Sequence, residues 1–367
     1  MQGTRSTRES DATLRVIVQT LIIVASAVVF STPLAAREST DVIIMKNGDR
    51  FTCTIKRLEA GVLYVGLDYA DGDVSLDWTK VARIESKQLF IVKTQDGLVI
   101  TGGLRTSPSA DANAATKVQV AETVQKSVII DKAQIVDLRQ TSEEFVRRFS
   151  GDIGLGSSYS KGNQATQYNL AAHTMYQRER WGAQMSLSSN LAASSGSNTS
   201  TRNLLSLGAY QLLPWDNYFY GGLGSLLQSS VQGITRQTSL GAGIGRFLKN
   251  TNRTRITLLG GAAWQITHYD QSIEPLPIEN VASALIALDA SLFKFSKTNV
   301  KITADVFPAL SDPGRVRFNT NASWFIKLFG DISWTVTFYG NWDTKPPPHF
   351  SSSDYGSTVG LSWDFGK

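Results

Sequence analysis

Long stretches of the carboxy-terminal two thirds of the chain alternate strictly between apolar and polar residues. In "DISWTVTFYGNW" one parity holds Ile332, Trp334, Val336, Phe338 and Trp342, and the other parity is mainly small and polar. This alternation predicts long strands that each have one apolar face. Strands in soluble proteins are usually about five or six residues long. Strands of about ten residues or more with this pattern are typical of a barrel in a membrane.

The pattern predicts twelve such strands, and the connections between them differ in length by parity. The even-numbered connections are mostly short, whereas the odd-numbered ones include "YDQSIEPLPIE" and "DTKPPPHFSSSD". Outer-membrane barrels have long outer loops, short periplasmic turns and an even number of strands, which returns both ends to the periplasmic side. The predicted strands are 150–160, 166–177, 181–193, 203–213, 217–228, 236–248, 253–267, 280–294, 298–308, 315–328, 331–342 and 355–366.

Aromatic residues gather near the predicted strand ends or on the apolar parity. Such residues form belts where a barrel meets the lipid headgroups. We expect the belts to include Tyr176, Trp181, Trp215, Phe219, Trp264, Tyr269, Trp334, Phe338 and Trp342.

Residues 41–140 follow a different pattern of short strands that occurs twice. "VIIMKNGDRFTCTI" resembles "FIVKTQDGLVITGGL", so that Gly48 matches Gly97 at an offset of 49 residues. "VSLDWTKVARIES" resembles "VIIDKAQIVDLRQ" at an offset of 54 residues. We interpret the region as two tandem β units of about 50 residues each, similar to Sm-like or SH3-like small barrels, a likeness that assigns no ligand. One sheet with a chance internal similarity is the alternative.

The first 36 residues have the features of an export signal. Arg5, Arg8 and Arg15 precede the apolar run "VIVQTLIIVASAVVF", and small residues allow a cut after Ala36. The run is shorter than the about 20 apolar residues of a membrane-spanning helix. We therefore expect a signal peptide over 1–36, periplasmic β units over 41–140 and an outer-membrane barrel over 147–367. An uncleaved amino-terminal anchor is the alternative.

Charge and cysteine content limit the partners. Charged residues make up 18% of the 367 residues, and the formal net charge is +5. A basic balance can indicate nucleic-acid binding, but the sequence has no run of Lys and Arg and no basic helix, so we expect no nucleic-acid partner. The single cysteine, Cys53, cannot form an internal disulfide and lies in the alternating stretch "FTCTI", which predicts a buried thiol.

The stretch from "RRFSGDIGLGSSYSKGNQATQYNL" to "GSTVGLSWDFGK" resembles a known family. It is similar to the salt-induced outer-membrane proteins, a family catalogued as a domain of unknown function, over about residues 147–367. The "GSSYSKGN" of the first hairpin is its most telling part. The resemblance implies an outer-membrane barrel and implies no catalytic residues.

Candidate chemistry inside the barrel is sparse. His268, in "ITHYDQ" at the end of the seventh strand, is the catalytic candidate, although no nucleophile motif accompanies it. Three scattered histidines and one cysteine have no metal-ligand spacing, so we expect no metal and no cofactor. The polar residues that we expect to face the lumen are His173, Asp289, Lys301, Asp305, Arg315, Arg317 and Lys327.

The final stretch "YGSTVGLSWDFGK" predicts a closing strand that pairs with the first strand and removes the sheet edge. It resembles the carboxy-terminal assembly signal of outer-membrane barrels, and the matching residues are Thr358, Gly360, Trp363 and Phe365. Gly366 and Lys367 extend beyond the last aromatic residue, where the signal commonly ends. The resemblance implies the barrel-assembly machinery as a partner, beside outer-membrane lipid.

The sequence thus predicts an all-β, non-enzymatic outer-membrane protein, which is either a passive small-solute pore or a structural envelope protein. Its periplasmic region would bind the cell wall or a periplasmic protein. Twelve strands enclose more space than eight, but charges of both signs in the lumen could pair and close it. One alternative is an outer-membrane lipid hydrolase that uses His268. Another is a soluble periplasmic β-protein, which would need Val316, Trp324, Trp334 and Phe338 buried under a second layer.

Overall fold

The computed structural model describes most of the chain from residue 40 onward, and the regular structure in it is strand apart from two single-turn 3-10 helices. Within the described part, no helix is long and apolar enough to cross a membrane. The signal peptide expected over 1–36 lies outside the described residues. These residues are 40–70, 73–106, 117–121, 127–140, 149–160, 165–178, 180–194, 200–214, 217–272, 276–294, 298–329 and 331–365.

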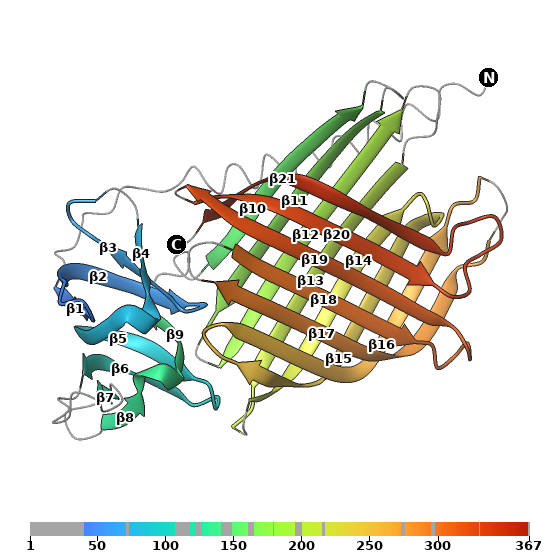
Figure 1. Ribbon diagram of the computed structural model, residues 1–367. Coiled ribbons are helices and arrows are strands. Elements are labelled where there is room, and N and C mark those ends of the chain that lie inside the picture. The colour runs from blue at the N-terminus through green and yellow to red at the C-terminus, as the bar shows by residue number, and fades with distance from the viewer. Residues whose placement is uncertain are drawn as a thin grey trace. The chain divides into compact units, whose positions relative to one another are not determined.

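Twelve antiparallel strands among the described residues form a closed barrel, which confirms the predicted fold class (Figure 1). Each strand pairs with the next along the chain, and the last pairs with the first. Their bounds differ from the predicted ones by at most three residues. The strands are β10 (Phe149–Ser160), β11 (Ala165–Gln177), β12 (Trp181–Ser194), β13 (Ser200–Leu212), β14 (Tyr218–Ser229), β15 (Ile234–Asn250), β16 (Thr254–Tyr269), β17 (Glu279–Lys294), β18 (Thr298–Pro308), β19 (Val316–Phe329), β20 (Ile332–Asp343) and β21 (Ser353–Phe365).

The alternation in the sequence separates the inner face of this barrel from its outer face. On β15, Leu240 is 63% exposed whereas its neighbour Ser239 is 3% exposed, and on β20 Phe338 is 58% exposed whereas Ser333 is 6% exposed. Soluble proteins rarely expose large continuous apolar surfaces, so this outer face indicates an apolar surrounding. Other exposed apolar side chains around the wall are Leu155, Tyr168, Met185, Leu207, Tyr220, Trp264, Ile286, Ile302, Trp324, Trp334 and Val359.

The two ends of the barrel have connections of different length. At one end, which we call the long-loop end, the chain connects its strands through 270–278, 309–315 and 344–352. At the opposite, short-turn end, the corresponding connections include 251–253 and 330–331. Since β10 begins and β21 finishes at the short-turn end, residues 41–140 join the barrel there.

The amino-terminal region forms a nine-stranded sheet in the described residues, with the order β4-β3-β2-β1-β5-β6-β7-β8 and with β9 paired to both β2 and β5. β1 pairs with β2 and with the first part of β5, and the second part of β5 pairs in the same way with β6 and β9. The two similar units are therefore joined through β5. The elements are β1 (Asp41–Met45), β2 (Arg50–Glu59), β3 (Val62–Gly66), β4 (Asp73–Asp77), η1 (Trp78–Lys80), β5 (Val81–Thr94), β6 (Val99–Thr106), β7 (Lys117–Ala121), β8 (Ser127–Asp131), η2 (Lys132–Gln134) and β9 (Ile135–Gln140).

Equivalent residues of the two units take equivalent conformations. Gly48 and Gly97 lie in the first turn of each unit with φ of +92° and +88°, a backbone region that L side chains rarely adopt. One continuous core includes the fully buried Cys53 and Phe90. Burial raises the pKa of the Cys53 thiol to about 12, with the Asp41 carboxylate adding to the effect. The thiol is thus a buried core group, as its sequence context predicts.

Candidate functional site

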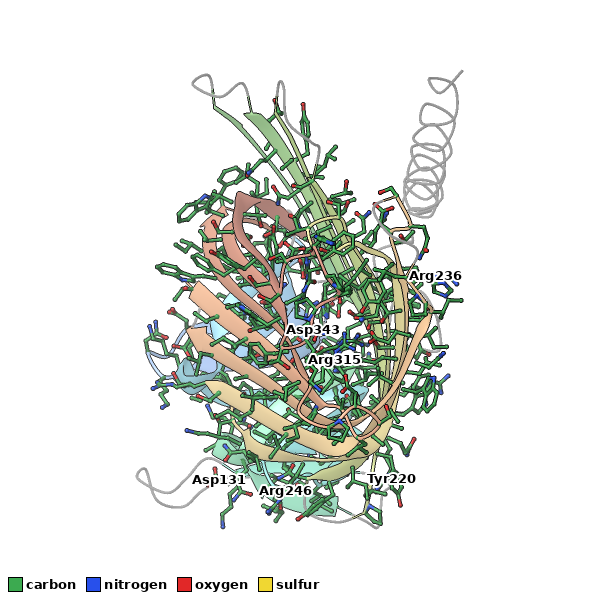
Figure 2. All side chains as sticks on the ribbon, turned by 90° about the vertical axis from the view of Figure 1, so that its right-hand side faces the viewer. Asp131, Tyr220, Arg236, Arg246, Arg315 and Asp343 are labelled. Atoms are coloured by element: carbon green, nitrogen blue, oxygen red, sulfur yellow. The ribbon has the colours of Figure 1, made fainter. Side chains whose placement is uncertain are left out.

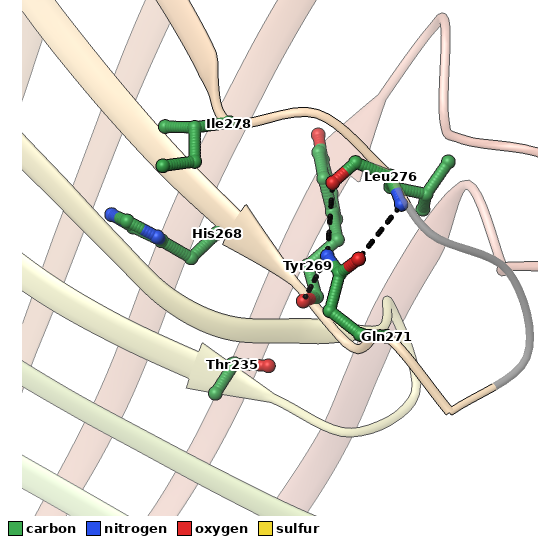
Figure 3. Close-up of a pocket in the computed structure, with 6 residues that line it drawn as sticks. All are labelled: Thr235, His268, Tyr269, Gln271, Leu276 and Ile278. Atoms are coloured by element: carbon green, nitrogen blue, oxygen red, sulfur yellow. Dashed lines mark hydrogen bonds between the residues drawn. The ribbon is translucent and has the colours of Figure 1, made fainter.

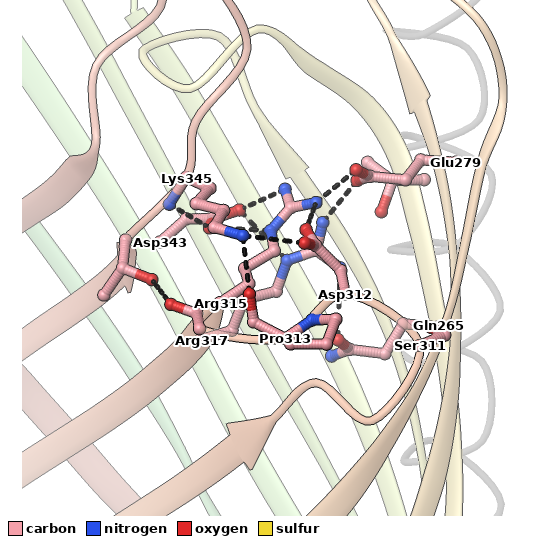
Figure 4. Close-up of polar contacts among 12 residues, drawn as sticks. Gln265, Glu279, Ser311, Asp312, Pro313, Arg315, Arg317, Asp343 and Lys345 are labelled. Atoms are coloured by element: carbon pink, nitrogen blue, oxygen red, sulfur yellow. Dashed lines mark hydrogen bonds and ion pairs between the residues drawn. The ribbon is translucent and has the colours of Figure 1, made fainter.

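Polar side chains concentrate at the long-loop end on the inner face of the barrel. Arg317 lies near the start of β19, Arg315 directly precedes that strand, Glu279 begins β17 and Asp343 ends β20. All four positions lie beside the long connections, so the four side chains are at the same end of the barrel. Figure 2 places Arg315 and Asp343 inside the ring of strands, and Figure 4 shows the contacts that join them.

Both arginines of this group bridge the same two carboxylates. Arg315 Nη2 lies 2.6 Å from Asp343 Oδ2, and Arg317 Nε lies 3.0 Å from the same oxygen. Arg317 Nη2 lies 2.5 Å from Glu279 Oε2, and Arg315 Nη1 also pairs with Glu279. Tyr269 Oη donates to Glu279 Oε2 at 2.7 Å. We call these five residues the arginine–carboxylate cluster. Its two formal positive and two formal negative charges balance, as buried charges require.

The cluster links strands that are not neighbours in the wall. Arg317 on β19 donates from Nη1 to Gln265 Oε1 on β16 at 3.1 Å, although β17 and β18 lie between these strands. The side chains of both arginines are almost fully buried, at 3% and 6% exposure. The cluster therefore fills the inner space beside β16–β20.

A second contact crosses the interior near the same end. Arg202 on β13 donates to Asn341 on β20 at 3.3 Å and lies 3.9 Å from the carboxylate of Asp354 on β21. Ser229 at the end of β14 donates to Asp354 at 2.6 Å. Since β10, β11 and β12 separate β21 from β13 along the wall, these bonds run across the lumen. We call them the Arg202 contact.

The last long connection, residues 344–352, also reaches the opposite wall. Ser351 N donates to Val231 O in the β14–β15 turn at 3.4 Å. In the same turn, Gly233 has φ of +63°, and a Cβ there would fall 2.2 Å from the Phe350 ring. The turn can therefore approach the aromatic ring only because residue 233 is glycine. Together with the Arg202 contact, this connection obstructs the lumen at the long-loop end.

The inner face is apolar along one part of the wall. Phe219 on β14, Leu259 on β16, Leu285 on β17 and Phe307 on β18 are buried there as one cluster. Two aromatic residues predicted to lie in the interfacial belts are in fact on this face: Phe219 is 6% exposed, and Tyr269 belongs to the arginine–carboxylate cluster. Those two predictions were wrong, because position near a strand end does not reveal which face a side chain takes. Trp215 lies outside the described residues.

The register places the predicted lumen residues on the same face as Arg317. Asp305 is opposite Asn319, Lys301 opposite Ser323, Asp289 opposite Thr303 and Lys327 opposite Ser333. His173 is opposite Asp152, with 3.7 Å between Nδ1 and Oδ1. Of the seven predicted residues, Arg315 and Arg317 are brought into one cluster, whereas the others lie along the strands.

Sequence reasoning missed Glu279, Asp343 and Arg202. Asp343 could have been found, because it continues the polar parity of its strand into the position next to a long connection, and Glu279 because it shares the parity of the predicted lumen residue Asp289. Arg202 lies just before the predicted start of its strand at residue 203. Its partners on β20 and β21 depend on which walls face each other across the lumen, and strand alternation carries no such information.

His268 lies on the outer face of β16, two residues beyond the outward Ile266. Arg236 on β15 approaches it, with 3.2 Å between Arg236 Nη2 and His268 Nε2. His268 also lines a pocket with Thr235, Tyr269, Gln271, Leu276 and Ile278 (Figure 3). The neighbouring Tyr269 hydroxyl bonds to Glu279 on the inner face, and Asp270 accepts from Ser272 N. The described contacts therefore do not arrange His268, Tyr269 and Asp270 as an acid–base group.

The predicted assembly-signal residues lie on the closing strand β21. Trp363 is 44% exposed, opposite Ile153 of β10. Thr358 and Gly360 are opposite Thr337 and Thr335 of β20, and Phe365 is opposite Gly151 of β10. The described seam between β10 and β21 has five paired positions, far fewer than the other strand pairs, such as β11 with β12. The remaining residues of the stretch, 366–367, are outside the described part.

No group of three His, Cys, Asp or Glu side chains in the described part of the chain is arranged to hold a metal ion. Comparison with curated proteins finds no match. A family described as "Protein of unknown function, DUF481" matches residues 153–365.

Several solved structures are distantly similar to the chain. The translocator domain of autotransporter NalP from Neisseria meningitidis is 14% identical over 59% of this chain and 87% of its own, with a TM-score of 0.32. A porin is 12% identical over 89% of this chain and 98% of its own, with a TM-score of 0.27. The CymD monoaromatic hydrocarbon channel is 8% identical over 76% of this chain and 87% of its own, with a TM-score of 0.27. Similarities this distant carry no argument, and the barrel is defined by the strand pairing of this chain alone.

Proposed function

The chain belongs to the DUF481 family, and we propose that it is a non-enzymatic barrel of a bacterial outer membrane that serves as a structural envelope protein. The outer face of the barrel supports a lipid environment. Trp324, Trp334 and Phe338 are 49%, 38% and 58% exposed, whereas a soluble protein would need them covered. Closed barrels and helices are the folds that can cross a bilayer, because all their backbone groups are paired internally.

The connections support one orientation. Long connections belong on the outer side and short turns on the periplasmic side of such barrels. The long-loop end would therefore face outward, and residues 41–140, which join the barrel at the short-turn end, would lie in the periplasm. Export of the chain by a signal peptide over 1–36 is part of the same proposal.

The observation that carries the structural role is the Arg202 contact across the lumen. It joins β13 to β20 and β21, and residues 344–352 lie against the β14–β15 turn beside it. Side chains that bond across the interior narrow the lumen at that level. An obstructed lumen favours a structural protein over a passive pore.

A pore is the second candidate, and the remaining inner face favours it. The inner positions of β19–β21 are mainly small and polar, including Asn319, Asn321, Ser333, Thr335 and Thr337. If the Arg202 contact opened, these residues would line a water-filled path. The pore would then be gated at the long-loop end.

Conductance of the purified full chain in planar bilayers tests the two candidates. We expect no steady conductance from the wild type, and none from Arg202→Ala, because the arginine–carboxylate cluster and residues 344–352 remain in place. Steady conductance from the wild type would overturn the structural role. Conductance that appears with Arg202→Ala alone would support the gated pore. Heat-modifiable migration on unboiled gels first establishes that each sample holds a folded barrel.

The periplasmic sheet supports a binding role in the same proposal. Its described edge strands β4 and β8 each pair on one side only, and a free edge can accept another strand. We propose the cell wall or a periplasmic protein as its partner. Sedimentation of the full chain with purified cell-wall sacculi tests the first option. Sedimentation that persists after deletion of 41–140 would contradict a role for this region.

A further inference from the structure

Two arginines mark the ends of the apolar outer face of β15. Arg236 and Arg246 are both exposed, on the same strand and the same face, and ten residues apart (Figure 2). The outward residues between them are uncharged and include Leu240 and Ile244. At about 3.3 Å per residue and a tilt of about 40°, ten residues span about 25 Å along the barrel axis. That height equals the apolar band of an outer-membrane barrel, so each arginine lies at the level of one layer of lipid headgroups.

A β-bulge lies directly beside Arg236 at the long-loop end of β15. The register of β15 against β16 runs from Ile234 opposite Tyr269 to Arg236 opposite His268, which leaves Thr235 as the extra residue. Thr235 and Arg236 are consecutive and both exposed. A bulge of this kind redirects side chains at a sheet end. It adds the Thr235 hydroxyl to the same outer surface as Arg236 and His268.

The hydrogen bond between Arg236 and His268 fixes the chemistry of this surface. A guanidinium has no acceptor, so His268 Nε2 must accept from Arg236 Nη2 and the imidazole proton lies on Nδ1. Arg236 keeps further N–H donors, and His268 Nδ1 and the Thr235 hydroxyl can also donate. The nearby carboxylate of Asp270 already accepts from Ser272 N at 2.8 Å. The surface therefore presents several donors, including those of a charged guanidinium, a set that suits an oxyanion.

An apolar wall adjoins these donors. Leu276 and Ile278 line the same pocket as Thr235 and His268, and Figure 3 shows His268 between Thr235 and Ile278. The amide of Gln271 bonds twice to the backbone of Leu276, since it donates to Leu276 O at 2.9 Å and accepts from Leu276 N at 3.0 Å. A ligand that fits would carry an anionic head and an apolar body.

We propose that Arg236, Thr235 and His268 bind the phosphate of an anionic lipid in the leaflet at the long-loop end. The inference rests on the proposed function, because it requires the barrel to lie in a membrane. The arginine supplies the charge and two or more parallel N–H donors, and the histidine and threonine complete the set. The apolar pocket wall then lies beside the upper part of the acyl chains.

Modification of His268 by diethyl pyrocarbonate tests the site. The full chain is reconstituted in phosphatidylcholine vesicles with increasing fractions of phosphatidylglycerol, and the rate at His268 is followed by peptide mass spectrometry. His349, in the 344–352 connection, is the internal reference. We expect phosphatidylglycerol to slow modification of His268 in the wild type. In Arg236→Gln, the fraction of phosphatidylglycerol that protects His268 by half should rise about tenfold, because the charge-assisted bonds to the phosphate are lost. Arg246→Gln is the matched control on the same face and should protect like the wild type.

Inorganic phosphate added to phosphatidylcholine vesicles separates two sources of the same ligand chemistry. Protection by phosphatidylglycerol alone supports the lipid, whereas equal protection by millimolar free phosphate would overturn it in favour of a free anion. Unchanged protection in Arg236→Gln, or no protection in the wild type, would also overturn the site. Membrane fractionation and heat-modifiable migration of the same samples report the barrel itself, so a failed lipid site is distinguishable from a failed membrane barrel.

Discussion

Trp78 and Lys132 hydrogen-bond to each other's backbone carbonyl from equivalent positions of the two amino-terminal units. Trp78 Nε1 donates to Lys132 O at 3.2 Å, and Lys132 Nζ donates to Trp78 O at 2.8 Å. Each residue opens a single-turn 3-10 helix after an aspartate whose side chain accepts from the backbone two residues on. The offset between them is the 54 residues of the sequence repeat. The two units are therefore held together through matched sites, and this pair should control the stability of the sheet.

We predict that Trp78→Ala destabilises the amino-terminal sheet by about 3–5 kcal/mol, because a large buried side chain leaves a cavity. Trp78→Phe keeps most of the apolar volume and loses the bond to Lys132 O, so it should cost about 1 kcal/mol. The readout is thiol labelling in urea, since Cys53 is the sole cysteine and is fully buried. Leu89→Ala, at a side chain that is 51% exposed, is the control and should shift the midpoint little. Equal midpoints for Trp78→Ala and Leu89→Ala would contradict the prediction.

Lys132 predicts a pH dependence of the same sheet. Burial lowers the pKa of its ammonium group from 10.5 to about 8, with Lys46 adding to the effect. Between these values the unfolded chain binds more protons than the folded one, so this group makes stability rise with pH from about 8 to about 10.5. The rise is at most about 3 kcal/mol, because solvent screens part of the effect at this incompletely buried ammonium group. The protein is equilibrated in urea at each pH, and the exposed Cys53 is then labelled in a short pulse at one fixed pH. The urea midpoints obtained in this way report the rise in stability. The rise should disappear in Lys132→Met, and a wild type with a flat profile over this window would refute it.

Strand bounds and the inner and outer faces could be predicted from the sequence, because a period of two is a local property. The lumen residues from Asp289 to Lys327 and the outward tryptophans follow from it directly. The Arg202 contact could not be predicted, since its partners on β20 and β21 depend on how opposite walls approach across the barrel. The joining of the two amino-terminal units through β5 was also missed. The repeat shows that two units are alike, but similarity alone does not reveal that one strand serves both.

Depth along the outer face should set the cost of a charge. Leu240 lies on β15 between Arg236 and Arg246, and we predict that Leu240→Arg destabilises the barrel by about 2–4 kcal/mol. Leu248 is similarly exposed, at 55%, but lies beyond Arg246, so Leu248→Arg should cost about 0–1 kcal/mol. Urea unfolding of the barrel in lipid vesicles measures both. Equal costs at the two depths would argue against a lipid-facing surface on β15.

The arginine–carboxylate cluster should stabilise the long-loop end. Arg317→Ala leaves Glu279 and Asp343 with one arginine between them in a buried site, and we predict a loss of about 3–5 kcal/mol. Lys345 pairs with Asp312 at 2.8 Å, but its side chain is 48% exposed. Lys345→Ala, the control, should therefore cost less than about 1 kcal/mol. The temperature at which the folded form disappears from unboiled gels ranks the variants. If Arg317→Ala melts no earlier than Lys345→Ala, the cluster contributes little to stability.

The closing seam should be sensitive to one added methyl group. A Cβ at Gly360 of β21 would fall 2.5 Å from the backbone oxygen of Leu155 on β10, a distance at which one strand must shift. The described seam has five paired positions, so few bonds are available to resist that shift. We predict that Gly360→Ala lowers the fraction of protein in the heat-modifiable, folded form. Gly260→Ala is the matched control, because a Cβ at Gly260 on β16 meets no atom within 4 Å. If Gly360→Ala and Gly260→Ala have equal folded fractions, the seam tolerates the added methyl group. The strands β10 and β21 would then pack less tightly at this point.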